Sequence, residues 1–240
     1  MSKYLILGAS SGIGRAVAEE LAAEGHTLIL ASSNESRLTS VKDSLCSPDT
    51  HTVSVFDARE PESLNRVYDQ AVNDGVKLDG VVYSVGTVLV TPLRTLKKED
   101  IDSVFGINFD TFLIAASLFA KKKYSSGGSF VAVSAANAHY PQKCMSVYAA
   151  SKGAIEAAVK TLALEMSEQN KRINAVIPGA TETAMIKDIP REQLDSIVSK
   201  QLNGLLSPED IADVICFLLS DKSRSITGRS IFADGGLLGQ

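Results

Sequence analysis

The sequence predicts an α/β fold, a doubly wound parallel sheet with helices on both faces, and three observations support it. Short runs rich in Val, Ile and Leu recur along the chain, at 4–7, 27–31, 52–56, 79–84, 128–133, 172–177 and 229–233. Segments with helical periodicity separate most of these runs. A glycine-rich stretch follows the first run directly. This alternation favours parallel strands joined by helical crossovers.

The helical segments follow in order between the strands. Helical periodicity predicts helices at 12–24, 35–46, 61–74, 99–123, 147–169 and 208–220. Pro61 and Pro208 suit a first helical turn, because proline has the required φ and no N–H to leave unpaired there. No linker, repeat or low-complexity tract interrupts the 240 residues, so we expect a single domain spanning 1–240.

The composition excludes several classes of function. The chain is 45% hydrophobic and carries a formal net charge of −4. Its longest basic run is Lys121–Lys122–Lys123, which is too short for a nucleic-acid-binding surface. The first apolar run begins at Tyr4, leaving no room for a signal peptide, and no uninterrupted apolar stretch could span a bilayer. We therefore expect a cytoplasmic protein without nucleic-acid or membrane partners.

The three cysteines do not form a recognisable framework. Cys46, Cys144 and Cys216 lie far apart and none belongs to a Cys-x-x-Cys pair. This spacing indicates neither a disulfide network nor a metal site. We expect reduced thiols and no bound metal.

The stretch GASSGIG, residues 8–14, lies between the first predicted strand and the first predicted helix. Glycines at this junction allow a tight turn and let backbone N–H groups approach a pyrophosphate, whose charge is favoured at a helix N-terminus. The stretch therefore predicts a nucleotide site. Its Gly-x-x-x-Gly-x-Gly spacing differs from the common Gly-x-Gly-x-x-Gly fingerprint.

Tyr148 and Lys152 stand four residues apart in the stretch YAASK. On the predicted helix this spacing puts the phenol and the ammonium on one face. A nearby positive charge stabilises the phenolate and lowers a pKa that is ordinarily about 10. We therefore expect Tyr148 to exchange a proton near neutral pH.

These features, taken in chain order, resemble the signature of the short-chain dehydrogenase/reductase family over nearly the whole chain. The similarity is greatest to the classical subfamily that includes 3-oxoacyl-carrier-protein reductases. It implies a single Rossmann-like domain. The matching positions are Gly8–Gly14, Asn108, Ser134, Tyr148 with Lys152, Pro178–Gly179 with Thr183, and Asp234–Gly236.

The resemblance implies a catalytic set of Asn108, Ser134, Tyr148 and Lys152. Hydride would pass from a nicotinamide to a carbonyl carbon while Tyr148 protonates the oxygen and Ser134 hydrogen-bonds it. Lys152 would also bind the nicotinamide ribose, and Asn108 would hold a water that links Lys152 to solvent. His139 is either an additional acid or base or a loop residue that lines or flanks the pocket.

The cofactor is expected to be NADP(H) rather than NAD(H). Ser32 stands where NAD-preferring relatives usually offer an acidic residue, so no carboxylate would repel a 2′-phosphate. Ser33 and Asn34 could donate hydrogen bonds to that phosphate, with Arg37 and Arg15 as counter-charges. The expected cofactor contacts are Gly8, Ala9, Ser10, Ser11, Gly12, Ile13, Gly14, Ser32, Ser33, Asn34, Arg37, Asp57, Ala58, Ser84, Gly86, Tyr148, Lys152, Pro178, Gly179, Thr181 and Thr183.

Two stretches depart from the family pattern. Tyr83–Ser84–Val85–Gly86 replaces the family's Asn-Asn-Ala-Gly, so other side chains must supply the bonds that the asparagines make. Residues 202–206, Leu-Asn-Gly-Leu-Leu, replace a loop that often contains arginine.

The segment 184–206 fits no strand and no single helix, and it follows directly on the predicted cofactor contacts. We expect it to form one or two short amphipathic helices that close over an apolar part of the substrate. The alternative is that its apolar residues only dock the segment onto the domain. These residues are Met185, Ile186, Ile189, Leu194, Ile197 and Val198.

The sequence thus predicts an NADP-dependent oxidoreductase that acts on a 3-oxoacyl thioester or a small ketone. The alternatives are a catalytically lapsed regulatory protein and an epimerase or dehydratase that uses the same Tyr/Lys pair. The resemblance also implies a homodimer or homotetramer built from 99–123, 147–169 and the C-terminal strand region. Lys121–Lys123, Lys171 and Arg172 could meet an acidic carrier protein, or could complement helix C-termini.

Overall fold

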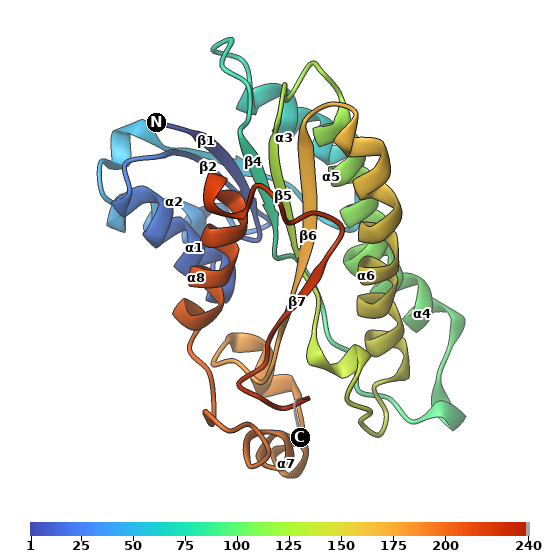
Figure 1. The fold of residues 1–240 in the computed structure, drawn as a ribbon. Coiled ribbons are helices and arrows are strands. Elements are labelled where there is room, and N and C mark those ends of the chain that lie inside the picture. Colours follow the sequence, from blue (N-terminus) through green and yellow to red (C-terminus); the bar gives the residue numbers. More distant parts are fainter. Residues whose placement is uncertain (239–240) are drawn as a thin grey trace.

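Seven parallel strands form one sheet in the computed structural model, which describes residues 1–238 (Figure 1). Their order is β3-β2-β1-β4-β5-β6-β7, so the order reverses between β1 and β4. All seven predicted strands and the doubly wound arrangement are confirmed. The strands are β1 (Lys3–Leu7), β2 (Thr27–Ser32), β3 (Thr52–Val55), β4 (Gly80–Tyr83), β5 (Gly128–Val133), β6 (Lys171–Pro178) and β7 (Ser230–Ala233).

Helices cover both faces of the sheet because successive strand residues point to opposite sides (Figure 1). Ile6, Leu30 and Val82 pack in a core with α1 (Gly12–Ala23), α2 (Glu35–Ser44) and α8 (Pro208–Leu219). Leu5, Leu7 and Val81 pack in a second core with α3 (Ser63–Ala71), α5 (Thr111–Ala120) and α6 (Ser146–Ser167).

Local capping explains where α8 begins. The Ser207 hydroxyl accepts from the Asp210 N–H at 3.2 Å, and the Asp210 carboxylate accepts from the Ser207 N–H at 2.7 Å, with Pro208 in the first turn. Pro61, in contrast, lies in the turn before α3, which begins at Ser63. The helix predicted for 61–74 is therefore shorter at both ends.

The predicted helix 99–123 is observed as α4 (Lys98–Phe105), a π-helical turn (Gly106–Asp110) and α5, which run on without a break. It is long and apolar enough to cross a membrane by length and composition. However, Phe112, Ala116 and Phe119 are fully buried against the sheet, so it is a core helix of the domain.

Two basic residues that were candidates for contact with an acidic partner serve helix ends instead. The Lys171 ammonium is buried and donates to the carbonyls of Phe119 and Ala120, at 2.9 and 2.8 Å. The Arg172 guanidinium donates to carbonyls of residues 218–220 at the end of α8. Both charges thus satisfy the orphan carbonyls that every helix C-terminus leaves.

The segment 184–206 contains a 3₁₀ helix (Ala184–Asp188) and α7 (Arg191–Val198). Figure 1 shows α7 beyond the edge at which the strands end. Ile197 of α7 is buried against Ile177 and Leu237, and the segment closes with a parallel bridge between Thr181 and Leu206. The short helices expected from the sequence are therefore present.

Candidate active site

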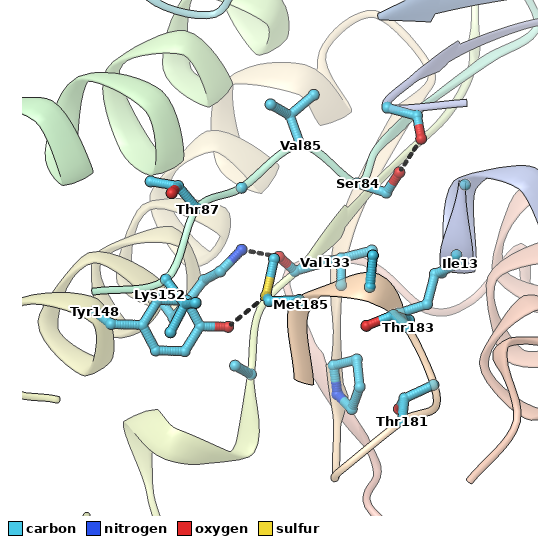
Figure 2. Close-up of a pocket in the computed structure, with 18 of the residues that line it drawn as sticks. Ile13, Ser84, Val85, Thr87, Val133, Tyr148, Lys152, Thr181, Thr183 and Met185 are labelled. Atoms are coloured by element: carbon cyan, nitrogen blue, oxygen red, sulfur yellow. Dashed lines mark hydrogen bonds between the residues drawn. The ribbon is translucent and has the colours of Figure 1, made fainter. Parts of the chain in front are cut away.

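A cavity of about 780 Å³ runs along the carboxyl ends of the strands. Its wall begins at the loops after β2 and β3, passes the switch between β1 and β4, and ends under the segment 184–198. Ligands of doubly wound sheets bind at this edge. Figure 2 shows part of the wall, with Tyr148 and Lys152 on one side and Thr181, Thr183 and Met185 on the other.

The glycine-rich turn between β1 and α1 is too tightly packed for larger residues. A Cβ on Gly14 would lie 2.3 Å from the Gly8 carbonyl oxygen, and a Cβ on Gly8 would lie 2.7 Å from the Ser84 hydroxyl. Ser10 to Gly14 line the cavity, and the first turn of α1 holds no acidic residue. The N-terminus of α1 can therefore receive a pyrophosphate.

Tyr83 and Ser84, which stand where the family pattern has asparagines, both make side-chain hydrogen bonds. The Ser84 hydroxyl donates to the Leu7 carbonyl at 3.0 Å, which ties the end of β4 to the end of β1 across the switch point. The Tyr83 hydroxyl donates at 2.6 Å to the carbonyl of Ile107, inside the π-helical turn. Both residues that replace the asparagines therefore hold the end of β4 to its neighbours.

Asn108 lies fully buried in that π-helical turn. Its amide donates to the Thr87 carbonyl at 3.0 Å and to the Ser151 hydroxyl at 2.9 Å, and it accepts from the Thr87 N–H at 2.8 Å. Both amide protons are thus engaged within the protein. In this structure Asn108 fixes the loop after β4 to α6 and has no amide proton left for a water.

Tyr148 and Lys152 share the cavity-facing side of α6 (Figure 2). The ammonium nitrogen lies 6.0 Å from the centre of the Tyr148 ring and donates to the Val133 carbonyl at 3.0 Å. Gly86 makes room for it, since a Cβ there would lie 3.1 Å from the Lys152 nitrogen. The predicted pairing of phenol and ammonium on one helix face is present.

Burial governs both proton equilibria in this ligand-free arrangement. Burial lowers the pKa of Lys152 to about 8. Burial also raises the pKa of Tyr148 above its usual value of 10. The expectation that Lys152 would lower the pKa of Tyr148 is therefore not met here, because desolvation opposes the phenolate and the ammonium is bonded to Val133.

The side chains around the Tyr148 ring are apolar. Its hydroxyl donates to the Met185 sulfur at 3.8 Å, a weak contact that Figure 2 shows across the cavity. Ala135, Met145 and Val88 pack against the same ring. Met185 therefore occupies the part of the cavity that a substrate group would have to enter to hydrogen-bond with the Tyr148 hydroxyl.

Ser134 lines the cavity, but its hydroxyl is bonded within the protein. Its buried hydroxyl lies 2.6 Å from one carboxylate oxygen of Glu156 and 3.1 Å from the Lys152 carbonyl. The other Glu156 oxygen lies 2.7 Å from Nε2 of His139. The residue expected to hold the substrate oxygen is thus bonded to Glu156 in this structure.

His139 lies beside the cavity rather than in its wall. Its half-exposed ring meets Phe232 edge-on, at 5.1 Å between ring centres. This placement agrees with a loop residue that flanks the pocket. Sequence reasoning missed Glu156, although an acidic residue four positions after Lys152 on the same helix is a visible signal.

At the other end of the cavity, Ser32 and Ser33 line the wall after β2. Asn34 instead caps α2, since its side-chain oxygen accepts from the Arg37 N–H at 2.9 Å. Neither Asn34 nor Arg37 lines the cavity among the described residues, and the Arg15 side chain pairs with Glu19 at 2.8 Å.

Arg59 is the basic residue in that part of the wall, and sequence reasoning missed it. Its guanidinium binds the Asp57 carboxylate, with the shortest contact at 2.6 Å, and this pairing lowers the pKa of Asp57. The sequence signal that could have identified Arg59 is its position two residues after Asp57, the aspartate that follows β3. Asp57 and Ala58 line the wall as expected.

All but one of the remaining predicted contacts line the cavity. Pro178, Gly179, Thr181 and Thr183 line the cavity, as do Ser84 and Gly86. Ala9 is fully buried in the core and is not part of the wall.

Comparison with known proteins places this site in a family. A profile described as "Enoyl-(Acyl carrier protein) reductase" matches residues 8–238. The chain is 33% identical to a 3-oxoacyl-(acyl-carrier-protein) reductase of Thermotoga maritima, over 98% of this chain and 96% of that one. It is 30% identical to a vibriobactin-specific 2,3-dihydro-2,3-dihydroxybenzoate dehydrogenase of Vibrio cholerae, over 98% and 95%.

A solved structure agrees with these matches. A short-chain dehydrogenase/reductase of Brucella melitensis, titled a glucose/ribitol dehydrogenase, superimposes with a TM-score of 0.92 at 27% identity. The superposition covers 98% of this chain and 96% of that one.

Proposed function

This chain belongs to the short-chain dehydrogenase/reductase family of NAD(P)-dependent oxidoreductases, and we propose that it uses NADP(H) to reduce a carbonyl that carries an apolar group. The observation that carries the proposal is the position of Tyr148 and Lys152. They lie between a turn suited to a pyrophosphate and a pocket lined by apolar side chains.

The residues present fit a nicotinamide dinucleotide. The N-terminus of α1 would hold the pyrophosphate, Lys152 the ribose hydroxyls and Thr183 the carboxamide. When bound, the cofactor supplies or accepts the hydride. Tyr148 gives its proton to the substrate oxygen, and Lys152 offsets the charge that remains on the phenol.

The preference for NADP(H) rests on the wall after β2 and β3. Ser32 and Ser33 present hydroxyls and no carboxylate to the position of a 2′-phosphate. Arg59, in the same part of the wall, brings a guanidinium that is paired with Asp57. A dianionic phosphate is favoured by hydroxyl donors and a guanidinium.

The apolar pocket favours an apolar substrate group. Among the described residues that line the cavity, the charged ones are Asp57, Arg59 and Lys152, and Lys152 is the one that lies beside Tyr148. A free carboxylate would need a cation besides Lys152, which a ketone or a 3-oxoacyl thioester does not need. The apolar lining residues are Val88, Met185, Ile186, Ile189, Ile197 and Leu237.

We further propose that 184–206 acts as a lid, and that the protein works in the cytoplasm as a homodimer or homotetramer. The contact between Met185 and the Tyr148 hydroxyl supports the lid, because the segment reaches the reacting group directly. A carrier protein would need basic residues other than Lys171 and Arg172, whose charges are used inside the fold.

NADPH oxidation with a panel of ketones and 3-oxoacyl esters tests this function, with Tyr148→Phe as the decisive variant. We expect turnover by the wild type, and loss of at least about 10²-fold in kcat for Tyr148→Phe with unchanged NADPH affinity, since only the proton donor is removed. A lapsed regulator would bind NADPH without turnover, and an epimerase would consume no net cofactor. Wild-type kcat in Tyr148→Phe would contradict the mechanism.

A further inference from the structure

The substrate oxygen needs a second hydrogen-bond donor. Hydride addition to a carbonyl carbon leaves negative charge on the oxygen, and donors placed at that oxygen stabilise the charge. Tyr148 is one donor. The apolar side chains that cluster with it, Ala135, Met145, Val88 and Met185, carry no strong donor, so the second donor must come from a polar residue of the cavity wall.

Ser134 is poorly placed to be that donor. A serine hydroxyl has one proton, and the 2.6 Å contact assigns it to the Glu156 carboxylate. Withdrawing the hydroxyl would remove a charge-assisted hydrogen bond from a carboxylate that is 6% exposed, leaving His139 as its remaining side-chain partner in the structure.

Asn137 has a proton to give. It lies in the cavity wall, and its side-chain nitrogen carries two protons. One is donated to the Gln142 side-chain oxygen at 2.6 Å. The other faces the Met145 sulfur at 3.5 Å, which is a weak acceptor.

Met145 places this proton near the reacting group, because it packs against both Ala135 and Tyr148. A carbonyl oxygen accepts a hydrogen bond better than a thioether, so substrate would displace the sulfur contact favourably. Gln142 holds the amide from the other side, and its own nitrogen donates to the Gln193 carbonyl of α7 at 3.4 Å.

We propose that Asn137, rather than Ser134, is the second donor to the substrate oxygen, and that Ser134 is a positioning residue that fixes Glu156; this rests on the proposed reductase function. The hydride goes to the carbonyl carbon, the Tyr148 proton goes to the oxygen, and the C=O double bond becomes a C–O single bond. Asn137 keeps both of its protons throughout.

Four proteins test this assignment: wild type, Asn137→Ala, Ser134→Ala, and Asn137→Ala combined with Ala135→Ser. The double variant puts a hydroxyl at the position that packs on Tyr148. We expect Asn137→Ala to lower kcat on the order of 10²-fold, as loss of one such donor does elsewhere. Ala135→Ser should restore about tenfold or more of that loss. NADPH affinity, measured by fluorescence, should stay unchanged in all four.

The pattern of losses decides the outcome. Ser134→Ala should reduce kcat less than Asn137→Ala, and its main effect should be a lower melting temperature. Near-wild-type kcat in Asn137→Ala, or a larger loss in Ser134→Ala, would overturn the assignment. A wild type that oxidises no NADPH with any carbonyl would refute the reductase function itself, and the role of Asn137 with it. The activity of the wild type therefore distinguishes failure of the reductase function from failure of the Asn137 assignment alone.

Discussion

At the scale of single residues, the direction of a polar side chain depends on the partner that holds it. The helix α6 alone places Tyr148 and Lys152 on one face. The glycine-rich turn is placed by its position between β1 and α1. The direction of the Ser134 hydroxyl depends on Glu156, which is 22 residues away. No local pattern encodes that partner, so the sequence could not predict the direction of the hydroxyl.

Lys152 should make NADPH binding depend on pH. Burial lowers its pKa to about 8 in the free protein, whereas ribose hydroxyls and phosphates around it favour the charged form in the complex. Affinity should therefore be constant below pH 8 and fall by up to about tenfold per unit above it. Fluorescence titration between pH 6.5 and 9.5 measures this. Lys152→Ala should bind more weakly at every pH and lose the decline above 8.

The choice between NADPH and NADH should depend on Ser32. Its side chain lines the cavity after β2, so Ser32→Asp places a carboxylate against a 2′-phosphate. We expect NADPH affinity to fall much more than NADH affinity, because only the former carries that phosphate. Titration of both cofactors against both proteins measures the change, and a wild type that already prefers NADH would refute the proposed preference.

At the scale of elements, the sequence predicted every strand, because β-branched runs bounded by turns recur in order. It did not predict the π-helical turn at Gly106–Asp110, which lies within the segment predicted as one helix. The Tyr83 hydroxyl, bonded to Ile107, supports this turn from the neighbouring strand. That contact joins residues 24 apart and becomes visible only once the strand and the helix are packed together.

Tyr83→Phe should therefore affect both stability and activity. It leaves the half-buried Ile107 carbonyl without this donor, so the free energy of unfolding should fall by about 1–3 kcal/mol. The same turn holds Asn108, so kcat should fall as well. Tyr68→Phe is the matched control, since its buried hydroxyl also donates to a helix carbonyl, that of Ala115 at 2.8 Å.

Denaturant unfolding and NADPH oxidation on the two variants separate the effects. Tyr68→Phe should lose similar stability and keep wild-type kcat, because its helix contact lies away from the cavity wall. Equal kcat in both variants would mean that the Tyr83 bond has no part in arranging the site.

The segment 184–206 should become protected when the site is filled. NADPH and a ketone together would give Thr183 and the apolar side chains near Met185 partners that close the segment over the cavity. Limited proteolysis should then cut 184–206 more slowly than without ligand, while cleavage elsewhere in the chain stays unchanged. Equal cleavage with and without both ligands would refute a lid and favour a segment that is simply docked.

At the scale of the whole molecule, the two apolar cores specify the layered architecture. The sequence pattern alone cannot distinguish an apolar helix face that is buried in a core from one that contacts a second copy of the chain. Helical periodicity marks an apolar side in either case. The structure resolves part of this. Leu113 on α5 and Leu164 on α6 remain exposed, as do Phe217 on α8 and Phe232 on β7.

Leu113, Leu164 and Phe232 lie on elements from which the family resemblance implies assembly, and Phe217 lies on α8. The four divide into a set on α5 and α6 and a set on α8 and β7. A homotetramer would use both sets, and a homodimer one. Light scattering at micromolar concentration should therefore give a mass of two or four chains. Leu164→Glu puts a charge into the first set, and Phe217→Glu puts one into the second. If the protein is a tetramer, each single variant should have half its mass, and the double variant should be a monomer. In a dimer one of the two variants should dissociate it and the other should leave it intact. A wild type that is monomeric and fully active at that concentration would refute assembly through these faces.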